Sequence, residues 1–346
     1  MEQGRDVDEE SESREVLSAD VRPTLQTAAV SGTGDVADMA VVWLHPTVAT
    51  QSLILAGSKD HTDGGLHVWE MDGTTELDFL AVGAVNSIDI RYDFPYDGGQ
   101  IDLIGLTNRS DQEVQFFTVD PDSREITQIG AHAIDSPDIY GLTLAHDQNS
   151  GTFYSIPNTE DGIVEQWEIS ADGTTINAAK VRTIDVGSQT EGAVADDVNG
   201  WLFIGEEEVG IWKYGLDPSA GSSREAVDSV SGNPDLAADV EGLTLYHGSS
   251  DQGYLIASSQ GNSRFTVYER GSPHQYLGSF ALIANPDEDI DEVTITDGIF
   301  VTSRDTSAQF SKGVFVAHDA ESSTESTNYK LVAWEDIALA LSLREP

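Results

Sequence analysis

Short runs of apolar and β-branched residues alternate with Gly, Asp, Asn and Ser along almost the whole chain. The runs have the length of single strands and the residues between them are typical of turns; examples are AVVWL (40–44), LILA (53–56), LHVWEM (66–71) and LDFLAV (77–82). Near the C-terminus, IALALSL (337–343) has the pattern of a short helix. The pattern therefore predicts an all-β protein built from many short, locally connected strands.

The strand pattern repeats with a period of about 50 residues. An acidic residue begins each repeat, with intervals between 49 and 53 residues, at Asp38, Asp89, Asp138, Glu191, Glu241 and Asp291. Three repeats also share a Gly at the start of the strand, in IYGLTLAH, TEGAVADD and VEGLTLYH. A repeat of this length with four strands is typical of a propeller blade. We therefore predict a six-bladed β-propeller, with four-stranded antiparallel blades around a central channel; the alternative is an open stack of sandwiches.

The two ends of the chain complete this prediction. Residues 1–22 are acidic, rich in Ser and without aromatic residues, which predicts a disordered leader. Residues 23–346 are then one propeller domain. Within it, the strand TLQTAAV (24–30) is expected to pair with a C-terminal strand such as YKLVAW (329–334) and so to close the ring.

The charge of the chain limits its partners. The sequence has 61 Asp and Glu against 17 Lys and Arg, only five of them Lys, and a formal net charge of −44. This argues against nucleic acid and against anionic membrane surfaces, because both are bound through basic side chains. Cations are the partners that the field of the protein favours. An acidic excess of this kind is common in proteins from high-salt cells, so most of the carboxylates need no local function.

Missing residue types and patterns narrow the chemistry further. The chain has no Cys, which excludes disulfides, thiolate zinc sites and a Cys nucleophile. It has no run of 18 apolar residues that would predict a transmembrane helix, and its N-terminus lacks the apolar core of a signal peptide. The eight His are scattered and form no HExxH pair, so each is expected to be an ordinary surface or core residue.

Acids at equivalent positions of the blades would meet at one end of the channel and form a ring of carboxylates. Such a ring keeps its charge only if cations lie among its members, and an irregular cage of oxygen ligands suits Ca²⁺ better than Mg²⁺. Further acids lie next to the ring in sequence. Glu206, Glu207 and Glu208 follow the strand WLFIG, and Asp239 stands two residues before Glu241 on the same face of its strand.

Two of the scarce basic residues share a position in the repeat. Lys59 follows the strand LILA, Arg109 follows the strand IDLIGL, and both therefore lie in the turn after the second strand of consecutive blades. They could face one pocket. A carboxylate ring that holds Ca²⁺ and is flanked by Lys and Arg would bind a multiply anionic ligand, because Arg can clamp a phosphate through two hydrogen bonds.

Several long motifs resemble the β-propeller phytases, the calcium-dependent alkaline phytase family. They include GDVADMAVVWLHP (34–46), SIDIRYDFP (87–95), SQTEGAVADD (188–197), DVEGLTLY (239–246) and YLIASSQGNSRFTVYER (254–270), and the similarity covers most of residues 34–335. The resemblance implies a six-bladed propeller that hydrolyses phosphomonoesters of phytate, presented as its calcium complex, by attack of a metal-activated water. It also implies several bound Ca²⁺ ions.

The resemblance also implies roles for single residues. Glu191 and Glu207 would position and deprotonate the water, while Lys59, Arg109 and Tyr140 would hold phosphate. The calcium ligands would be Asp38, Glu191, Glu207, Asp239, Glu241, Gln260 and Asp291, and the repeat adds Asp89 to them. We further expect a monomer. Because phytate is an external nutrient, the expected location is extracellular or at the cell surface.

Three departures from the family pattern keep alternatives open. Met39 stands where the family has a calcium-binding acid, and Asp60 and Glu160 stand where it has Lys. One alternative is therefore a non-catalytic or weakly active propeller that binds calcium and anions. The other is a calcium-dependent lactonase-type propeller hydrolase, which would not need Lys59 and Arg109.

Overall fold

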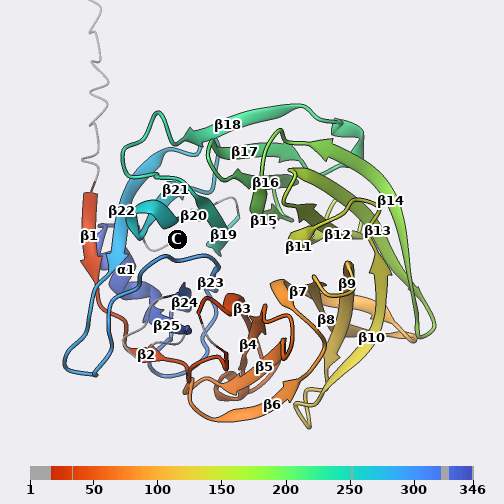
Figure 1. Ribbon diagram of the computed structural model, residues 1–346, viewed down its shortest axis with the longest axis horizontal. Helices are drawn as coiled ribbons and strands as arrows, with labels where there is room; N and C mark the ends of the chain where they lie inside the picture. The colour runs from red at the N-terminus through yellow and green to blue at the C-terminus, as the bar shows by residue number, and fades with distance from the viewer. Residues whose placement is uncertain (1–16, 33, 251, 321–326, 345–346) are drawn as a thin grey trace, which may run out of the picture.

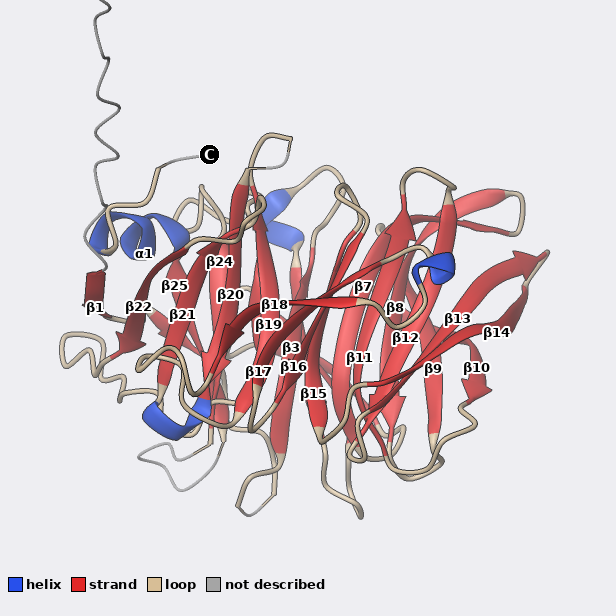
Figure 2. Ribbon diagram, turned by 90° about the horizontal axis from the view of Figure 1, so that it is seen from above, coloured by secondary structure: helices blue, strands red, loops and turns tan. Residues whose placement is uncertain are grey.

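Six four-stranded sheets form a closed ring in the computed structural model, which describes residues 17–32, 34–250, 252–320 and 327–344. The sheets surround a central axis as blades (Figure 1), and their strands cross the thickness of the disc when it is viewed at right angles (Figure 2). The predicted six-bladed, all-β propeller is confirmed.

The first three blades follow one another along the chain, and in each the strands run in sequence order from the axis outward. Their strands are β3 (Ala37–Trp43), β4 (Leu53–Ser58), β5 (Gly65–Glu70) and β6 (Glu76–Leu80); β7 (Val85–Tyr96), β8 (Gly99–Asn108), β9 (Glu113–Val119) and β10 (Ile126–Ala133); and β11 (Ile139–Asp147), β12 (Thr152–Thr159), β13 (Ile163–Asp172) and β14 (Thr175–Asp185).

Blades four and five have the same order, whereas blade six borrows its outermost strand from the N-terminus. The strands are β15 (Thr190–Asp196), β16 (Trp201–Glu206), β17 (Gly210–Gly215) and β18 (Arg224–Ser229); β19 (Val240–His247), β20 (Gly253–Ser259), β21 (Arg264–Glu269) and β22 (Tyr276–Leu282); and β23 (Ile299–Val301), β24 (Val314–Asp319), β25 (Asn328–Ala333) and β2 (Leu25–Gln26). The helix α1 (Trp334–Ala340) follows, close to the predicted 337–343.

The N-terminal segment joins the last two blades. The strand β2 pairs antiparallel with β25, so the predicted closing strand is confirmed. Before it, β1 (Leu17–Val21) pairs in parallel with the outer edge of β22 and adds a fifth strand to blade five (red and blue in Figure 1). Positions 1–16 of the predicted leader lie outside the described residues, and β1 lies in the part of the predicted leader that the structure describes.

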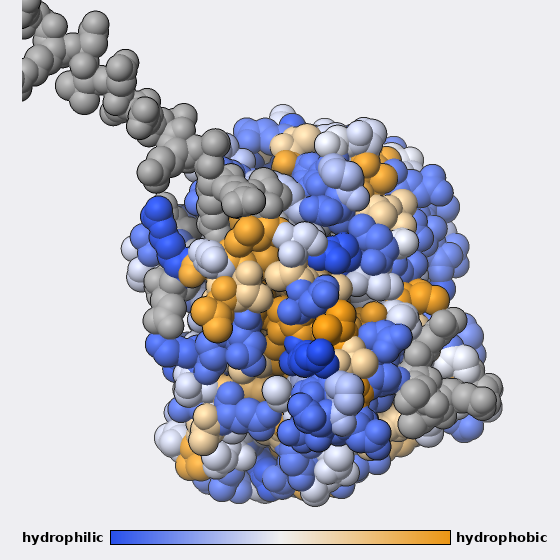
Figure 3. Space-filling model, turned by 90° about the vertical axis from the view of Figure 1, so that its left-hand side faces the viewer, coloured by the Kyte–Doolittle hydropathy of each residue, from blue (hydrophilic) through white to orange (hydrophobic). Residues whose placement is uncertain are grey.

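The inner strands are buried on both faces because neighbouring blades cover them. All seven residues of β3 are buried, whereas the outer strand β14 is exposed at most of its positions. This explains why the inner strands have near-continuous apolar runs and the outer ones do not. On the side that carries β1 and α1, hydrophobic residues gather among hydrophilic ones (Figure 3). Within the described residues no helix is long and apolar enough to span a membrane.

The channel contains a cavity of about 560 Å³, lined by residues of the inner strands. On β3 it begins at Met39 and on β19 at Leu243, so it lies beyond the first residues of these strands. All inner strands start at the same end of the axis, and that end holds the acidic residues described next.

Candidate active site

The inner strands of five blades begin in the same way. In β3, β7, β11, β15 and β19 the first residue pairs with a residue of the second strand of the blade, and the next two residues together oppose a single residue of that strand. Regular pairing then resumes. In blade four, for example, Thr190 pairs with Glu206 and the next pair is Ala193 with Ile204. This repeated bulge makes the second residue of each strand equivalent from blade to blade. These residues, which we call the inner ring, are Asp38, Asn86, Tyr140, Glu191 and Glu241.

Glycine follows the inner-ring residue where the next blade leaves no room for a side chain. A Cβ on Gly141 would lie 1.9 Å from the carbonyl oxygen of Glu191, and a Cβ on Gly192 would lie 1.6 Å from that of Glu241. The Gly that recurs at the start of these strands in the sequence is therefore required by the close packing of neighbouring inner strands around the axis.

The same contact identifies the sixth member of the inner ring. The N–H of Gly242 donates to the carbonyl oxygen of Asp297 at 3.1 Å, and a Cβ on Gly298 would lie 2.6 Å from the carbonyl oxygen of Asp38. Asp297 therefore contacts blade five on one side, and Gly298 packs against blade one on the other, as the other inner-ring residues and their glycines contact the blades beside them. Asp291, which the 50-residue repeat suggested for blade six, lies outside the ring.

A second set of side chains comes from the residue directly after the second strand of each of the first five blades. Its backbone N–H donates to the carbonyl oxygen of the residue before the inner strand, for example from Lys59 to Val36 at 2.8 Å and from Glu207 to Gln189 at 3.1 Å. We call this set the turn ring: Lys59, Arg109, Glu160, Glu207 and Gln260. The predicted equivalence of Lys59 and Arg109 is thus a property of the fold.

Three buried carboxylates converge in blades four and five. Glu191, Glu207 and Glu241, here called the three-glutamate cluster, each offer an oxygen within 4.8 Å of the others. Each of the three residues is buried, with 4% of its surface exposed. Within the described part of the chain, Oε1 of Glu207 and Oε2 of Glu241 have no hydrogen-bond partner. Because an unpaired buried acceptor is costly, the cluster is suited to a cation, and its all-oxygen donor set fits a hard one.

The pKa values of the three-glutamate cluster also favour a bound cation. Burial, with help from Glu191 and Asp239, raises the pKa of Glu207 to about 8. Burial and Glu191 likewise raise the pKa of Glu241 well above its usual value. Without a cation these groups therefore hold protons at a pH where an exposed Glu would be ionised. A bound cation would displace the protons.

The other side of the ring carries its own cation. Nζ of Lys59 lies 2.8 Å from Asp35 Oδ2, 3.2 Å from Asp38 Oδ2 and 3.0 Å from Asp297 Oδ2; these four residues are the lysine-centred cluster. Burial by itself would lower the pKa of Lys59, but the three carboxylates raise it. Lys59 therefore remains charged and neutralises part of the cluster.

Arg109 and Tyr140 lie between the two clusters. The guanidinium of Arg109 is 4.9 Å from the centre of the Tyr140 ring, forms an ion pair with Glu160 and donates to Asn86 Oδ1 at 3.2 Å. Asn86 in turn donates to Glu191 Oε1 at 2.6 Å. Burial, together with the nearby acids, raises the pKa of Tyr140, so its hydroxyl keeps its proton.

The structure brings Gln260 and Asp239 to the same end of the channel. Gln260 Nε2 donates to Asp297 Oδ1 at 2.7 Å, and its backbone N–H donates to the carbonyl oxygen of Asp239. The side chain of Asp239 is half-buried, and its burial and Glu208 raise its pKa. Of the eight ligands expected from the sequence, six therefore gather here.

Asp89 and Asp291 do not gather with them. Asp89 lies deeper in the channel, paired with Arg91 at 2.9 Å, and accepts hydrogen bonds from Thr143 Oγ1 and the backbone of Leu144. Asp291 is paired with the fully buried Lys330 at 2.7 Å. In the structure a basic side chain thus neutralises each of these carboxylates.

Several residues at this end of the channel were missed by the sequence analysis. Asn86 was not assigned because it is not an acid, and Asp297 was not assigned because Asp291 satisfied the period. The sequence did contain a signal for Asp297, because the acid–glycine pair Asp297–Gly298 matches the pairs Glu191–Gly192 and Glu241–Gly242. Asp35 and His318, which lie beside Asp297, carry no comparable signal.

Comparisons with known proteins agree on one family. Residues 6–345 match the family described as Phytase. Among curated proteins, the chain is 36% identical over 324 residues to a protein of Bacillus subtilis (strain 168) named 3-phytase; the match covers 90% of this chain and 83% of that protein.

Solved structures of low sequence identity are also similar in part. One is described as the crystal structure of a Nidogen/Laminin complex, with 14% identity, a TM-score of 0.46, and coverage of 87% of this chain and 97% of that one. Another is the β-propeller domain of Cps50 (Swd1) from Myceliophteria thermophila, with 10% identity, a TM-score of 0.49, and coverage of 89% and 99%. These likenesses carry no argument about function.

Proposed function

The chain belongs to the phytase family, and from that premise we propose that it is a calcium-dependent 3-phytase, a phosphoric monoester hydrolase that removes phosphate from myo-inositol hexakisphosphate. The observation that carries the proposal is the three-glutamate cluster, in which two buried oxygens lack partners within the described residues, beside the phosphate-binding candidates Lys59, Arg109 and Tyr140.

The donor set of the acidic end of the channel supports calcium as the metal. The three-glutamate cluster offers only oxygens, and Asp239 and Gln260 add a carboxylate and an amide beside it. Irregular cages of oxygen ligands are typical Ca²⁺ sites. When bound, Ca²⁺ would neutralise phosphate oxygens and lower the pKa of a coordinated water.

The side chains of the protein would activate the water and bind the phosphate. Glu191 and Glu207 would orient the attacking water and accept its proton. Arg109, stacked on Tyr140, would exchange Glu160 for a phosphate oxygen. Lys59 and the Tyr140 hydroxyl would hold further oxygens and stabilise charge on the phosphoryl group.

The test is phosphate release from phytate at high salt, with Ca²⁺, with a chelator, and with Ca²⁺ added back after chelation. We expect activity with Ca²⁺, loss with chelator and recovery on re-addition. Full activity in the chelator would exclude the calcium-dependent mechanism, and no phosphate release under any condition would exclude phytase activity.

The family match does not favour the two alternatives, a non-catalytic propeller and a lactonase-type hydrolase. Simultaneous replacement of Lys59 and Arg109 would separate the lactonase from the phytase, because only phosphate binding needs both cations. We also propose that the protein is a monomer, testable by light scattering, and that it acts outside the cell or at its surface, testable by fractionation of the source cells.

Asp89 and Asp291 remain proposed calcium ligands from the sequence. For either to bind Ca²⁺, the ion would have to displace Arg91 or Lys330 from its ion pair. Replacement of each Asp by Asn, followed by calcium titration, tests the two assignments separately.

A further inference from the structure

The inner ring contains one amide. In blade two its residue is Asn86, which is fully buried at the start of β7. Asn86 Nδ2 donates to Oε1 of Glu191 in blade four at 2.6 Å, and Asn86 Oδ1 accepts from Nη1 of Arg109 at 3.2 Å. Both polar atoms of this buried side chain are therefore bonded to residues that the proposed function uses, Glu191 for water and Arg109 for phosphate.

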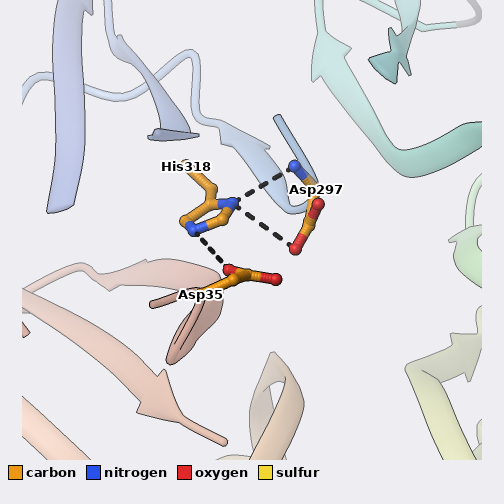
Figure 4. A group of neighbouring side chains, drawn as sticks. All are labelled: Asp35, Asp297 and His318. Carbon is orange, nitrogen blue, oxygen red and sulfur yellow. Dashed lines mark hydrogen bonds and ion pairs between the residues drawn. The ribbon is translucent and has the colours of Figure 1, made fainter. Parts of the chain in front are cut away.

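Two members of the inner ring show how the residue type fits its neighbours. In blade six the ring residue is Asp297, whose carboxylate accepts hydrogen bonds from Lys59 Nζ at 3.0 Å and Gln260 Nε2 at 2.7 Å. Its backbone N–H donates to the imidazole of His318 (Figure 4). Asn86 instead faces a carboxylate on one side and a guanidinium on the other. Because a carboxylate accepts and a guanidinium donates, only a group with both a donor and an acceptor satisfies the two.

We propose that Asn86 is a positioning residue that sets the place of Arg109 relative to Glu191, and so the place of the phosphate relative to the attacking water. The inference rests on the proposed function, which assigns phosphate to Arg109 and water to Glu191. The amide has a single orientation that makes both hydrogen bonds, because the reverse one would set its NH₂ against the guanidinium. Misplacement of reacting groups by about 1 Å costs about 10²-fold in rate.

Arg109 needs such an anchor once phosphate is bound. Its guanidinium is held by Glu160, by Asn86 and by the face of the Tyr140 ring. The Glu160 side chain is 41% exposed, and in the proposed mechanism phosphate takes its place. Asn86 is uncharged, so it does not compete with an anion for the guanidinium charge. A guanidinium has five N–H donors, and Asn86 would hold Nη1 while the other N–H groups turn to the ligand.

The test measures phosphate release from phytate, with saturating Ca²⁺, for the wild type, Asn86→Ala, Arg109→Ala and the double variant. Asn86→Ala should raise KM by about tenfold, because Arg109 loses its anchor, and lower kcat by about tenfold, because Glu191 loses its donor. In the Arg109→Ala background the same substitution should leave KM unchanged and still lower kcat. A loss of packing alone would change KM by the same factor in both backgrounds, and that result would overturn the proposal.

Because Asn86 is buried, Asn86→Ala could lose activity through misfolding. Asn86→Asp preserves the shape of the side chain and separates its two hydrogen bonds, since a carboxylate still accepts from Arg109 but cannot donate to Glu191. We expect kcat to fall at least as far as in Asn86→Ala, and KM to rise less. Wild-type kcat in Asn86→Asp would mean that only the shape of the side chain matters, and would overturn the proposal.

The matched control is Asn199→Ala. Asn199 also donates to a carboxylate, that of Asp196 at 2.8 Å, but it lies in the turn after β15, at the opposite end of this strand from Glu191. Its replacement should leave both KM and kcat unchanged.

The failure of this inference can be told apart from the failure of the proposed function. If the wild type releases no phosphate, the proposed function is wrong. If the wild type is active and Asn86→Ala has the same KM and kcat, only the inference is wrong. Calorimetric titration with inorganic phosphate in the presence of Ca²⁺ tests the role of Asn86 without turnover. Asn86→Ala should weaken phosphate binding by about tenfold, and equal affinity would overturn the proposal.

Discussion

The three-glutamate cluster and the lysine-centred cluster lie at the same end of the channel and differ in how their negative charge is neutralised. In the lysine-centred cluster, an internal ammonium lies within 3.2 Å of all three carboxylates. In the three-glutamate cluster no comparable cation is present among the described residues, and two buried oxygens are left without partners. The difference indicates where the fold supplies its own counter-charge and where it depends on an ion from solution.

The largest expected effect comes from the three-glutamate cluster. Glu191→Gln keeps the shape of the side chain but removes a carboxylate that orients and deprotonates water, and we expect kcat for phytate to fall by about 10²–10⁴-fold. Glu208→Gln, an exposed neighbour, should leave kcat nearly unchanged. Full activity of Glu191→Gln, with an unchanged circular dichroism spectrum, would remove Glu191 from the mechanism.

The next effect should come from breaking the lysine-centred cluster. Lys59→Met leaves Asp35, Asp38 and Asp297 without their cation, and because Lys59 is largely buried we expect a loss of about 3 kcal/mol in unfolding free energy with chelator present. Urea denaturation measures it. The control is Lys213→Met, which removes a lysine of similar burial whose one carboxylate partner, Glu225, is exposed, so its loss should be clearly smaller. Equal losses would mean that the three carboxylates around Lys59 add nothing to its contribution.

A pH series examines the uncompensated cluster more closely. The pKa of Glu207 is about 8 in the folded protein, against 4.5 ordinarily. Between these values the folded state holds a proton that the unfolded chain has released, so the unfolding free energy falls as pH rises. For the chelated protein we expect a loss on the order of a few kcal/mol between about pH 5 and pH 8.

Ca²⁺ should abolish much of this decline, because the ion takes the place of the protons. Glu207→Gln should flatten the chelated curve, and this comparison separates Glu207 from the repulsion among the many other acids. A chelated wild-type protein that is more stable at pH 8 than at pH 5 would contradict the assignment.

The smallest expected effect is a change in KM for phytate when the ion pair between Arg109 and Glu160 is removed. Glu160→Gln removes the ion-pair partner of Arg109, so the guanidinium no longer has to exchange a carboxylate for phosphate. Because both side chains are partly exposed, we expect KM for phytate to fall only a few-fold. Asp161→Asn, an exposed neighbour, is the control. A rise in KM for Glu160→Gln would show that Glu160 positions Arg109 instead of competing for it.

The sequence allowed the fold to be predicted because the 50-residue period and the closing strand are local patterns. It allowed Lys59 and Arg109 to be placed together because each directly follows a recognisable strand. The inner ring was harder to predict. Its positions are set by a backbone bulge and not by residue type, so Asn86 and Tyr140 occupy places that a search for acids misses.

Long-range partners could not be predicted at all. Asp89 fits the acidic period, yet it accepts hydrogen bonds from Thr143 and Leu144 of the next blade, because its position along β7 puts it deeper in the channel. His318 and Asp35 are far apart in sequence and meet only because the ring closes. Which carboxylates receive an internal cation is decided by side-chain contacts in the folded protein, and the strand pattern does not encode these contacts.

The closure of the ring has a consequence for biosynthesis. The Tyr329 N–H in β25 donates to the Oγ1 of Thr27, the residue after β2, across 302 residues of sequence. A nascent chain therefore cannot complete blade six until β25 has been synthesised, and native contacts of this sequence separation are slow to form. A premature stop that removed β25 would leave every other blade encoded and the circle open.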